Sequence, residues 1–177
     1  MTSYDNISRQ QLVDRLLAPR SADDNDHESL LRQRLDLARE ILLRDLSGKI
    51  SSTPVMDSPD TLREWLSLYF LGKEREVFLV LFLDNRHRLL AAENLFAGTI
   101  DGTPVYPREI VKEALRHNAA AVCVAHNHPS GDAEPSACDR SLTLKVREAL
   151  ALVDIRLLDH LVVGGERIVS LAERGWV

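Results

Sequence analysis

The chain has 177 residues, of which 45% are hydrophobic and 28% charged, an ordinary composition for about one globular domain. Its 22 lysines and arginines are outnumbered by 27 aspartates and glutamates. The net charge of −5 therefore does not support a nucleic-acid partner held by bulk charge, although a local basic patch would be compatible with one. Two cysteines are too few for a disulfide framework or a cysteine-rich zinc site. The apolar runs fall far short of the ~18 residues of a membrane span and no signal-peptide pattern is visible, so we expect a cytoplasmic protein without membrane contact.

Residues 1–50 are predicted to form a helical extension that contains an acidic linker. A short amphipathic helix is expected before Pro19, and residues 20–28 are polar and acidic, as in a linker. A longer helix is predicted over residues 29–47, with Gly48 ending it. Its apolar positions recur at spacings of three and four: Leu31, Leu35, Ala38, Leu42 and Leu46. This face could pair with a second copy of the chain, so a homodimer is one expected assembly.

Residues 51–177 alternate between strand and helix patterns. A helix is expected to begin at Ser58-Pro59, with the serine as N-cap. Val77–Leu83 and Ala119–Ala125 show no polar alternation, so both are predicted to be strands buried on two faces, in the middle of a sheet. The remaining elements are a strand over 87–96, helices from Pro107 and over 136–152, and strands over 155–163 and 167–171. This order predicts an α/β domain with three layers, α/β/α, around a mixed central sheet.

The most informative segment follows the second buried strand. His126 and His128 are two residues apart, and alternate side chains of an extended backbone point the same way, so both imidazoles can face one ion. Residues 129–131, Pro-Ser-Gly, predict a turn, and Pro135-Ser136 predicts a helix start that would bring Asp139 back to the histidines. Two imidazoles and a carboxylate with one open position are typical of a catalytic zinc site.

Each part of this pattern also has a structural interpretation. The two histidines could be a polar strand end, and Ser136 with Asp139 could be a helix-capping pair, a role that is compatible with ligation. Asp132 or Glu134 could replace a ligand if the loop folds differently. Cys138 is interpreted as a packing residue, with a cysteinate ligand as the alternative. A purely structural zinc site would need a fourth protein ligand, such as Cys138 or Glu134.

The segment has the spacing H-x-H-x7-S-x2-D, which resembles the motif of the JAMM/MPN+ metalloprotease family. The stretches Val105–Glu109, Leu158–Leu161 and Glu173–Trp176 are similar to the RadC-like bacterial branch of that family. The resemblance extends over about residues 35–177. It implies a cytidine-deaminase-like JAB/MPN fold and a RadC-like metal-binding domain over residues 51–177.

The resemblance also implies roles for individual residues. The implied Zn²⁺ ligands are His126, His128 and Asp139. Ser136 corresponds to the serine that hydrogen-bonds the metal water or the developing oxyanion. Glu76, just before the first buried strand, corresponds to the glutamate base, and Glu74 is the fallback because it would point the same way.

These correspondences imply a zinc-dependent hydrolase. A metallopeptidase or isopeptidase would cleave an amide of a protein or peptide substrate by a zinc-activated water, with Glu76 as general base. The alternative is a DNA-repair-associated or protein-interaction module that uses the metal domain as a non-catalytic scaffold. A zinc deaminase is not expected, because the chain lacks its His-x-Glu and Pro-Cys-x-x-Cys motifs.

Overall fold

A computed structural model describes residues 4, 6–18, 27–98 and 105–177 of the chain. The greater part of the predicted acidic linker, residues 20–26, lies outside the described residues. The elements in chain order are α1 (Arg9–Leu17), α2 (His27–Ser52), the 3₁₀ turn η1 (Val55–Asp57), α3 (Pro59–Phe70), β1 (Val77–Leu83), β2 (Leu89–Ala97), α4 (Pro107–Arg116), β3 (Ala121–Asn127), α5 (Ala137–Ala151), β4 (Arg156–Gly164) and β5 (Arg167–Ser170). Among these, no helix combines the length and the apolar composition that crossing a bilayer requires.

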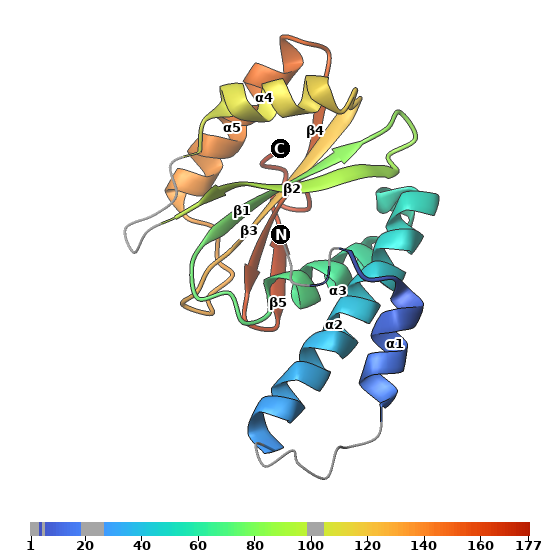
Figure 1. Ribbon diagram of the computed structural model, residues 1–177. Helices are drawn as coiled ribbons and strands as arrows, with labels where there is room; N and C mark the ends of the chain where they lie inside the picture. Colours follow the sequence, from blue (N-terminus) through green and yellow to red (C-terminus); the bar gives the residue numbers. More distant parts are fainter. Residues whose placement is uncertain (1–3, 5, 19–26, 99–104) are drawn as a thin grey trace.

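The five strands form one mixed sheet in the order β2-β1-β3-β4-β5 (Figure 1). β3 and β4 are parallel, whereas the other neighbouring pairs are antiparallel. The two apolar runs, β1 and β3, lie inside the sheet, as predicted, and every residue of β3 is buried. β3 begins and ends two residues later than predicted, because residues 119 and 120 belong to the turn before it. His126 is therefore part of the strand and not of the loop that follows.

Helices cover both faces of the sheet, so the predicted α/β/α arrangement is confirmed (Figure 1). One face packs against α2 and α3 through residues that include Leu46, Ile50, Leu62, Leu66, Leu79, Leu81, Ala125 and Leu161. The other face packs against α4 and α5 through residues that include Phe78, Val80, Phe82, Ile110, Val122, Val124, Val146 and Leu150. Because side chains alternate along β3, His126 lies on the α5 face and Asn127 on the α3 face.

Helix α2 does not end at Gly48, as the sequence predicted, but continues to Ser52. Leu46 and Ile50 are buried in the core between α2 and the sheet. Their packing outweighs the low helix propensity of a single glycine, which is a weak local preference. The chain leaves the helix only where Pro54 follows.

The buried face of α2 also differs from the predicted stripe. Leu37 and Ile41 pack with Leu12 of α1 in a small separate core. Three leucines of the predicted stripe are instead exposed, namely Leu31 (51%), Leu35 (61%) and Leu42 (50%). Leucine and isoleucine occur on several sides of this helix, so spacings of three and four fit more than one face, and contacts with α1 and α3 decide which face is buried.

Gly48 offers a direct test of this description of α2. A Cβ atom at Gly48 would meet nothing within 4 Å, and the residue is helical, so Gly48→Ala should stabilise the protein by about 0.5–1 kcal/mol. Urea denaturation measures the change. As a contrast, Gly175 has φ +71° and also has free space around it, so Gly175→Ala should destabilise by roughly 1 kcal/mol. A loss of stability in Gly48→Ala would contradict the continuous helix.

Candidate metal centre

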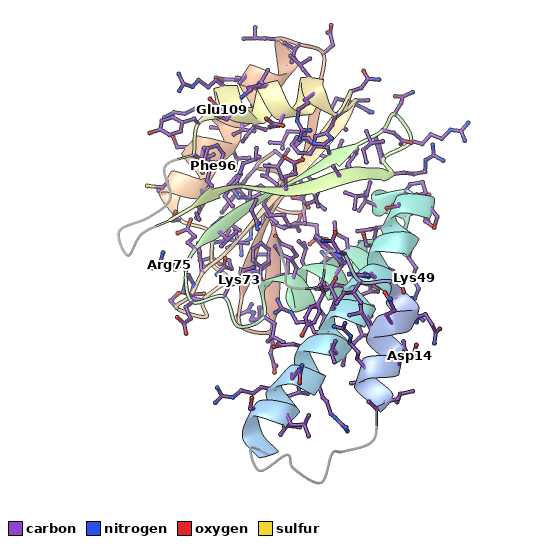
Figure 2. The ribbon with its side chains drawn as sticks, viewed as in Figure 1. Asp14, Lys49, Lys73, Arg75, Phe96 and Glu109 are labelled. Carbon is purple, nitrogen blue, oxygen red and sulfur yellow. The ribbon has the colours of Figure 1, made fainter. Side chains whose placement is uncertain are left out.

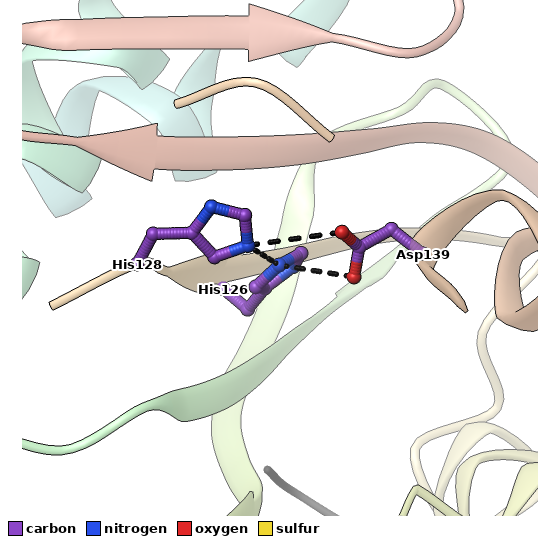
Figure 3. A group of neighbouring side chains, drawn as sticks. All are labelled: His126, His128 and Asp139. Atoms are coloured by element: carbon purple, nitrogen blue, oxygen red, sulfur yellow. Dashed lines mark hydrogen bonds and ion pairs between the residues drawn. The ribbon is translucent and has the colours of Figure 1, made fainter. Parts of the chain in front are cut away.

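Three ligand-type side chains converge where β3 ends and α5 begins (Figure 3). His126 Nε2 lies 2.9 Å from His128 Nε2 and 3.3 Å from Asp139 Oδ1, and His128 Nε2 lies 3.7 Å from Asp139 Oδ2. These are the three residues singled out by their spacing in the sequence. The structure therefore brings together two imidazoles and a carboxylate, as the extended strand end and the returning helix predicted.

Asp139 is held in place by the start of α5. Its carboxylate Oδ2 accepts hydrogen bonds from the Ser136 backbone N–H at 2.6 Å and from the Ser136 hydroxyl at 2.7 Å. In return, the Asp139 backbone N–H donates to Ser136 Oγ at 3.1 Å, which completes a capping box. The capping interpretation of this pair is thus confirmed. The cap leaves Oδ1 directed at His126, so capping and an approach to the histidines coexist.

His128 is oriented by the loop that follows it. Its Nδ1 lies 2.7 Å from the backbone carbonyl oxygen of Asp132. A carbonyl oxygen can only accept, so Nδ1 donates, and in the neutral ring Nε2 carries the lone pair. That lone pair faces His126 and Asp139, where lone pairs and negative charge would repel one another without a cation between them. The donor set therefore fits a divalent metal ion.

Burial keeps the buried ring of the cluster neutral. Desolvation is the main reason that the pKa of His126 falls to about 4, and the neighbouring Asp139 charge only partly opposes it. Burial on its own would raise the pKa of the Asp139 carboxyl, but the positive charge that His126 gains at acidic pH and the Ser136 hydrogen bonds together hold it below its usual value. At neutral pH His126 is neutral and Asp139 is ionised, the forms in which these side chains bind metals.

The other candidate ligands do not join the cluster. Cys138 is exposed. The Glu134 carboxylate binds Arg174, and the Asp132 carboxylate accepts the Glu134 backbone N–H. Within the described part of the chain, the cluster consists of three residues.

Glu76 lies directly before β1, one strand away from the histidines. Phe78 is paired with His126 across the antiparallel β1–β3 ladder, so the same register places residue 76 opposite His128. Its backbone continues the sheet, because its carbonyl oxygen accepts the Gly98 N–H at 2.9 Å. Phe78 and Glu76 are two residues apart and thus share the face on which His126 lies. Glu74 lies beyond a bend at residue 75 and is exposed.

Asn127, between the two histidines, is a residue of the site that sequence reasoning missed. It is buried on the opposite face of β3, where Oδ1 accepts the Val77 N–H at 2.9 Å and Nδ2 donates to the Arg75 carbonyl at 3.0 Å. Lys73 and Arg75 belong to the segment that leads into β1 (Figure 2). Asn127 thus joins the strand of the histidines to the segment that carries Glu76. No local pattern singled out Asn127, because it stands at the end of the strand beside His126 and its burial and partners arise only in the fold.

His160 and Thr143 were also missed as parts of the site. In the sequence, His160 belongs to the stretch Leu158–Leu161, which carries the family resemblance but no ligand spacing. In the structure the His160 ring contacts His126 directly, with its Nε2 2.9 Å from His126 Nδ1. The Asp159 carboxylate instead accepts from the His160 backbone N–H. Thr143 Oγ1 lies 2.7 Å from His160 Nδ1 on the far side of the ring.

A cavity of about 210 Å³ opens beside the cluster. It lies between the end of α3 and the loop after β3, and its walls include Phe70, Lys73, Asn127 and His128. A larger hollow, of about 820 Å³, lies between α2 and α3 and is lined by residues such as Leu42 and Arg63. None of the three cluster residues lines that larger hollow. The smaller cavity borders His128 and Asn127, but neither His126 nor Asp139 lines it.

Fold and cluster define a class of protein, an α/β/α domain with a His-His-Asp group at a strand end. Residues 56–176 match the RadC-like JAB domain, so the chain belongs to the RadC-like JAB domain family. It is 55% identical to a UPF0758 protein of Cellvibrio japonicus over 144 residues, which are 81% of this chain and 64% of that protein. A UPF0758 protein of Halorhodospira halophila is 56% identical over 142 residues, 80% of this chain and 63% of the relative. A UPF0758 protein of Vibrio cholerae is 51% identical over 144 residues, which are 81% of this chain and 64% of that protein.

The chain thus spans less than two thirds of the length of these curated relatives. The family match begins at residue 56, whereas the domain boundary predicted at residue 50 falls within α2. That boundary stays a prediction.

Gly164 tests how the loop holds His128. A Cβ atom at Gly164 would lie 2.4 Å from the Ala133 backbone nitrogen and 2.5 Å from the Asp132 carbonyl carbon. Gly164→Ala must therefore displace the carbonyl that orients His128, and we expect affinity for added Zn²⁺ to fall about 10-fold or more, as for other partners of ligating histidines. Chelator competition measures this affinity. Gly165→Ala is the control: its φ of +57° makes the change cost stability, but its Cβ would make only ordinary contact, 3.5 Å from the Gly131 oxygen, so zinc affinity should be nearly unchanged. Equal affinity in both variants would contradict the role of the loop.

Proposed function

We propose that the chain is a zinc-dependent hydrolase, a metallopeptidase or isopeptidase, with zinc held by His126, His128 and Asp139. The observation that carries the proposal is the convergence of these ligand atoms without a fourth protein ligand among the described residues. Catalytic zinc sites have this composition, because the open position is needed for water or substrate. Membership of the RadC-like JAB domain family supports the same assignment.

The zinc, when bound, supplies Lewis-acid activation of a water and of the substrate carbonyl. The residues of the chain would then have to move the proton and hold the developing charge. Both tasks need side chains close to the open position but outside the ligand set.

Glu76 is the proposed general base. It would take the proton of the attacking water and return it to the leaving amine, a contribution of about 10²–10⁴-fold in such reactions. The sheet register supports Glu76 over Glu74, because residue 76 continues the strand on the face of His126, whereas the bend at residue 75 separates Glu74 from that pattern. Asn127 would keep Glu76 in register with the histidines through its bonds to the neighbouring backbone.

Ser136 is proposed to donate a hydrogen bond to the oxyanion. In the structure its hydroxyl donates to Asp139 Oδ2, so this role requires the hydroxyl to rotate. The Ser136 backbone N–H would still hold the same carboxylate oxygen after that rotation. A donor of this kind is worth about 3 kcal/mol of transition-state stabilisation.

The proposed substrate is a protein or peptide, cleaved at an amide bond. A cavity on the α3 side of the sheet borders His128, with Lys73 and Phe70 in its walls. A cytoplasmic site of action is part of the proposal. The alternative function suggested by the sequence is a non-catalytic domain that binds protein or DNA. It predicts zinc binding with no cleavage.

The first experiment separates ligation from catalysis. Wild-type protein, His126→Ala and Glu76→Gln are loaded with zinc, and their metal content and cleavage of a mixed peptide library are measured. We expect one zinc per wild-type chain, almost none in His126→Ala, and full zinc but an at least 100-fold lower cleavage rate in Glu76→Gln. Full zinc and full activity in both variants would contradict the proposal. A zinc-loaded wild-type protein without cleavage would favour the scaffold alternative.

The second experiment concerns Asn127. Asn127→Ala removes the bonds to the Val77 N–H and the Arg75 carbonyl but no ligand. We expect zinc content to stay at the wild-type level while cleavage falls about 10–100-fold, because a misplaced base loses rate steeply. The free energy of unfolding should fall by about 1–3 kcal/mol, since two buried backbone groups lose their partner. Assays are run at a temperature where circular dichroism shows the variant folded. An unchanged cleavage rate would exclude Asn127 as the residue that positions the base.

A further inference from the structure

We propose that His160 and Thr143 are positioning residues that fix the ring proton of His126 on Nδ1, so that its Nε2 is free to bind the metal. The inference rests on the part of the proposed function that makes His126 a ligand. It does not depend on what the protein cleaves.

The three side chains form a continuous buried chain of hydrogen bonds. His126 Nδ1 lies 2.9 Å from His160 Nε2, His160 Nδ1 lies 2.7 Å from Thr143 Oγ1, and Thr143 Oγ1 lies 2.6 Å from the Asp139 backbone carbonyl. All three are at least 99% buried. The chain thus begins at one proposed ligand and ends on the backbone of another, so it links β3, β4 and α5 behind the metal position.

The direction of this chain follows from the metal at its first end. A metal ion would bind the lone pair of His126 Nε2, the atom that faces His128 and Asp139, so the ring proton of His126 has to be on Nδ1. His126 then donates from Nδ1 to His160 Nε2, which places the His160 proton on Nδ1. His160 in turn donates to Thr143 Oγ1, and the hydroxyl proton of Thr143 goes to the Asp139 carbonyl.

The opposite direction of the chain is incompatible with metal binding. If Thr143 donated its hydroxyl proton to His160 Nδ1, His160 would donate from Nε2 to His126 Nδ1, and the proton of His126 would be on Nε2. A protonated Nε2 cannot bind a metal. The neutral form of His126 that can act as a ligand therefore needs an acceptor for the His160 Nδ1 proton, and Thr143 Oγ1 is that acceptor.

A packing role alone would not depend on the hydroxyl of Thr143. The His160 ring also packs edge-on against Phe78, with 5.7 Å between the ring centroids, and this contact needs only its size and shape. The Asp159 carboxylate does not orient the ring, because it accepts from the Ser170 hydroxyl and from the backbone N–H groups of His160 and Ala172. Thr143 is thus the partner that determines which nitrogen of His160 carries the proton.

The test compares Thr143→Val, which keeps the shape of the side chain, with Thr143→Ser, which keeps the hydroxyl. In Thr143→Val, His160 loses its acceptor, so its proton is expected to move to Nε2 and that of His126 to its own Nε2. Nitrogen-15 NMR of the histidine rings with and without zinc reports these positions, and chelator competition reports zinc affinity. We expect Nδ1 protonation of both rings in zinc-loaded wild type and Thr143→Ser. In metal-free Thr143→Val we expect Nε2 protonation of His126, and its zinc affinity should be about 10–100-fold lower.

The outcomes separate this inference from the proposed function. Unchanged ring protons and unchanged zinc affinity in Thr143→Val would overturn the inference, even if the protein is an active hydrolase. A wild-type protein that binds no zinc would overturn both, whereas one that binds zinc without cleaving peptides would overturn only the proposed hydrolase. Should Thr143→Val fail to fold, His160→Gln and His160→Leu provide the same comparison, because the glutamine amide oxygen can accept from His126 and leucine cannot. Equal zinc affinity of those two variants would overturn the inference.

Discussion

The convergence of two imidazole nitrogens and a carboxylate at the end of β3 is the constraint on which the rest of the site depends. Such atoms repel one another unless a cation lies between them, so hydrogen bonds from other residues must keep each of the three side chains in place. The helix cap at Ser136 holds Asp139, the Asp132 carbonyl holds His128, and the chain through His160 holds His126. Each of these supports comes from a different element. The site is therefore assembled only when the loop, β4 and α5 are all in place.

The residues on the two faces of β3 contribute to the site in different ways. On the α5 face, His126 meets the residues that orient it. On the α3 face, Asn127 binds the backbone on either side of Glu76 and borders the cavity next to the cluster. The interior position of β3, between β1 and β4, makes both connections possible, because each neighbouring strand delivers one partner. Helix α2 contributes to the core beneath the α3 face, and α1 packs with α2 in a separate small core. Neither helix touches the three cluster residues in the contacts described.

The parts of the fold and site that could be predicted are those encoded in local patterns. The unbroken apolar runs of β1 and β3 identify interior strands, and the spacing from His126 to Asp139 brings three ligand types to one strand end. The contact between His160 and His126 spans 34 residues and depends on the parallel pairing of β3 with β4, which no local pattern specifies. The course of α2 was also wrongly predicted at two points. Burial of Ile50 overrides Gly48, and packing on α1 selects Leu37 over the leucines of the predicted stripe.

The most direct test of the central claim is X-ray absorption spectroscopy of the zinc-loaded protein at the zinc edge. The account predicts only nitrogen and oxygen neighbours at about 2.0–2.2 Å, with two imidazoles, one carboxylate and one water. A sulfur neighbour at about 2.3 Å would indicate that Cys138 closes the site, and it would contradict the account. A signal with four protein ligands and no water would contradict it equally.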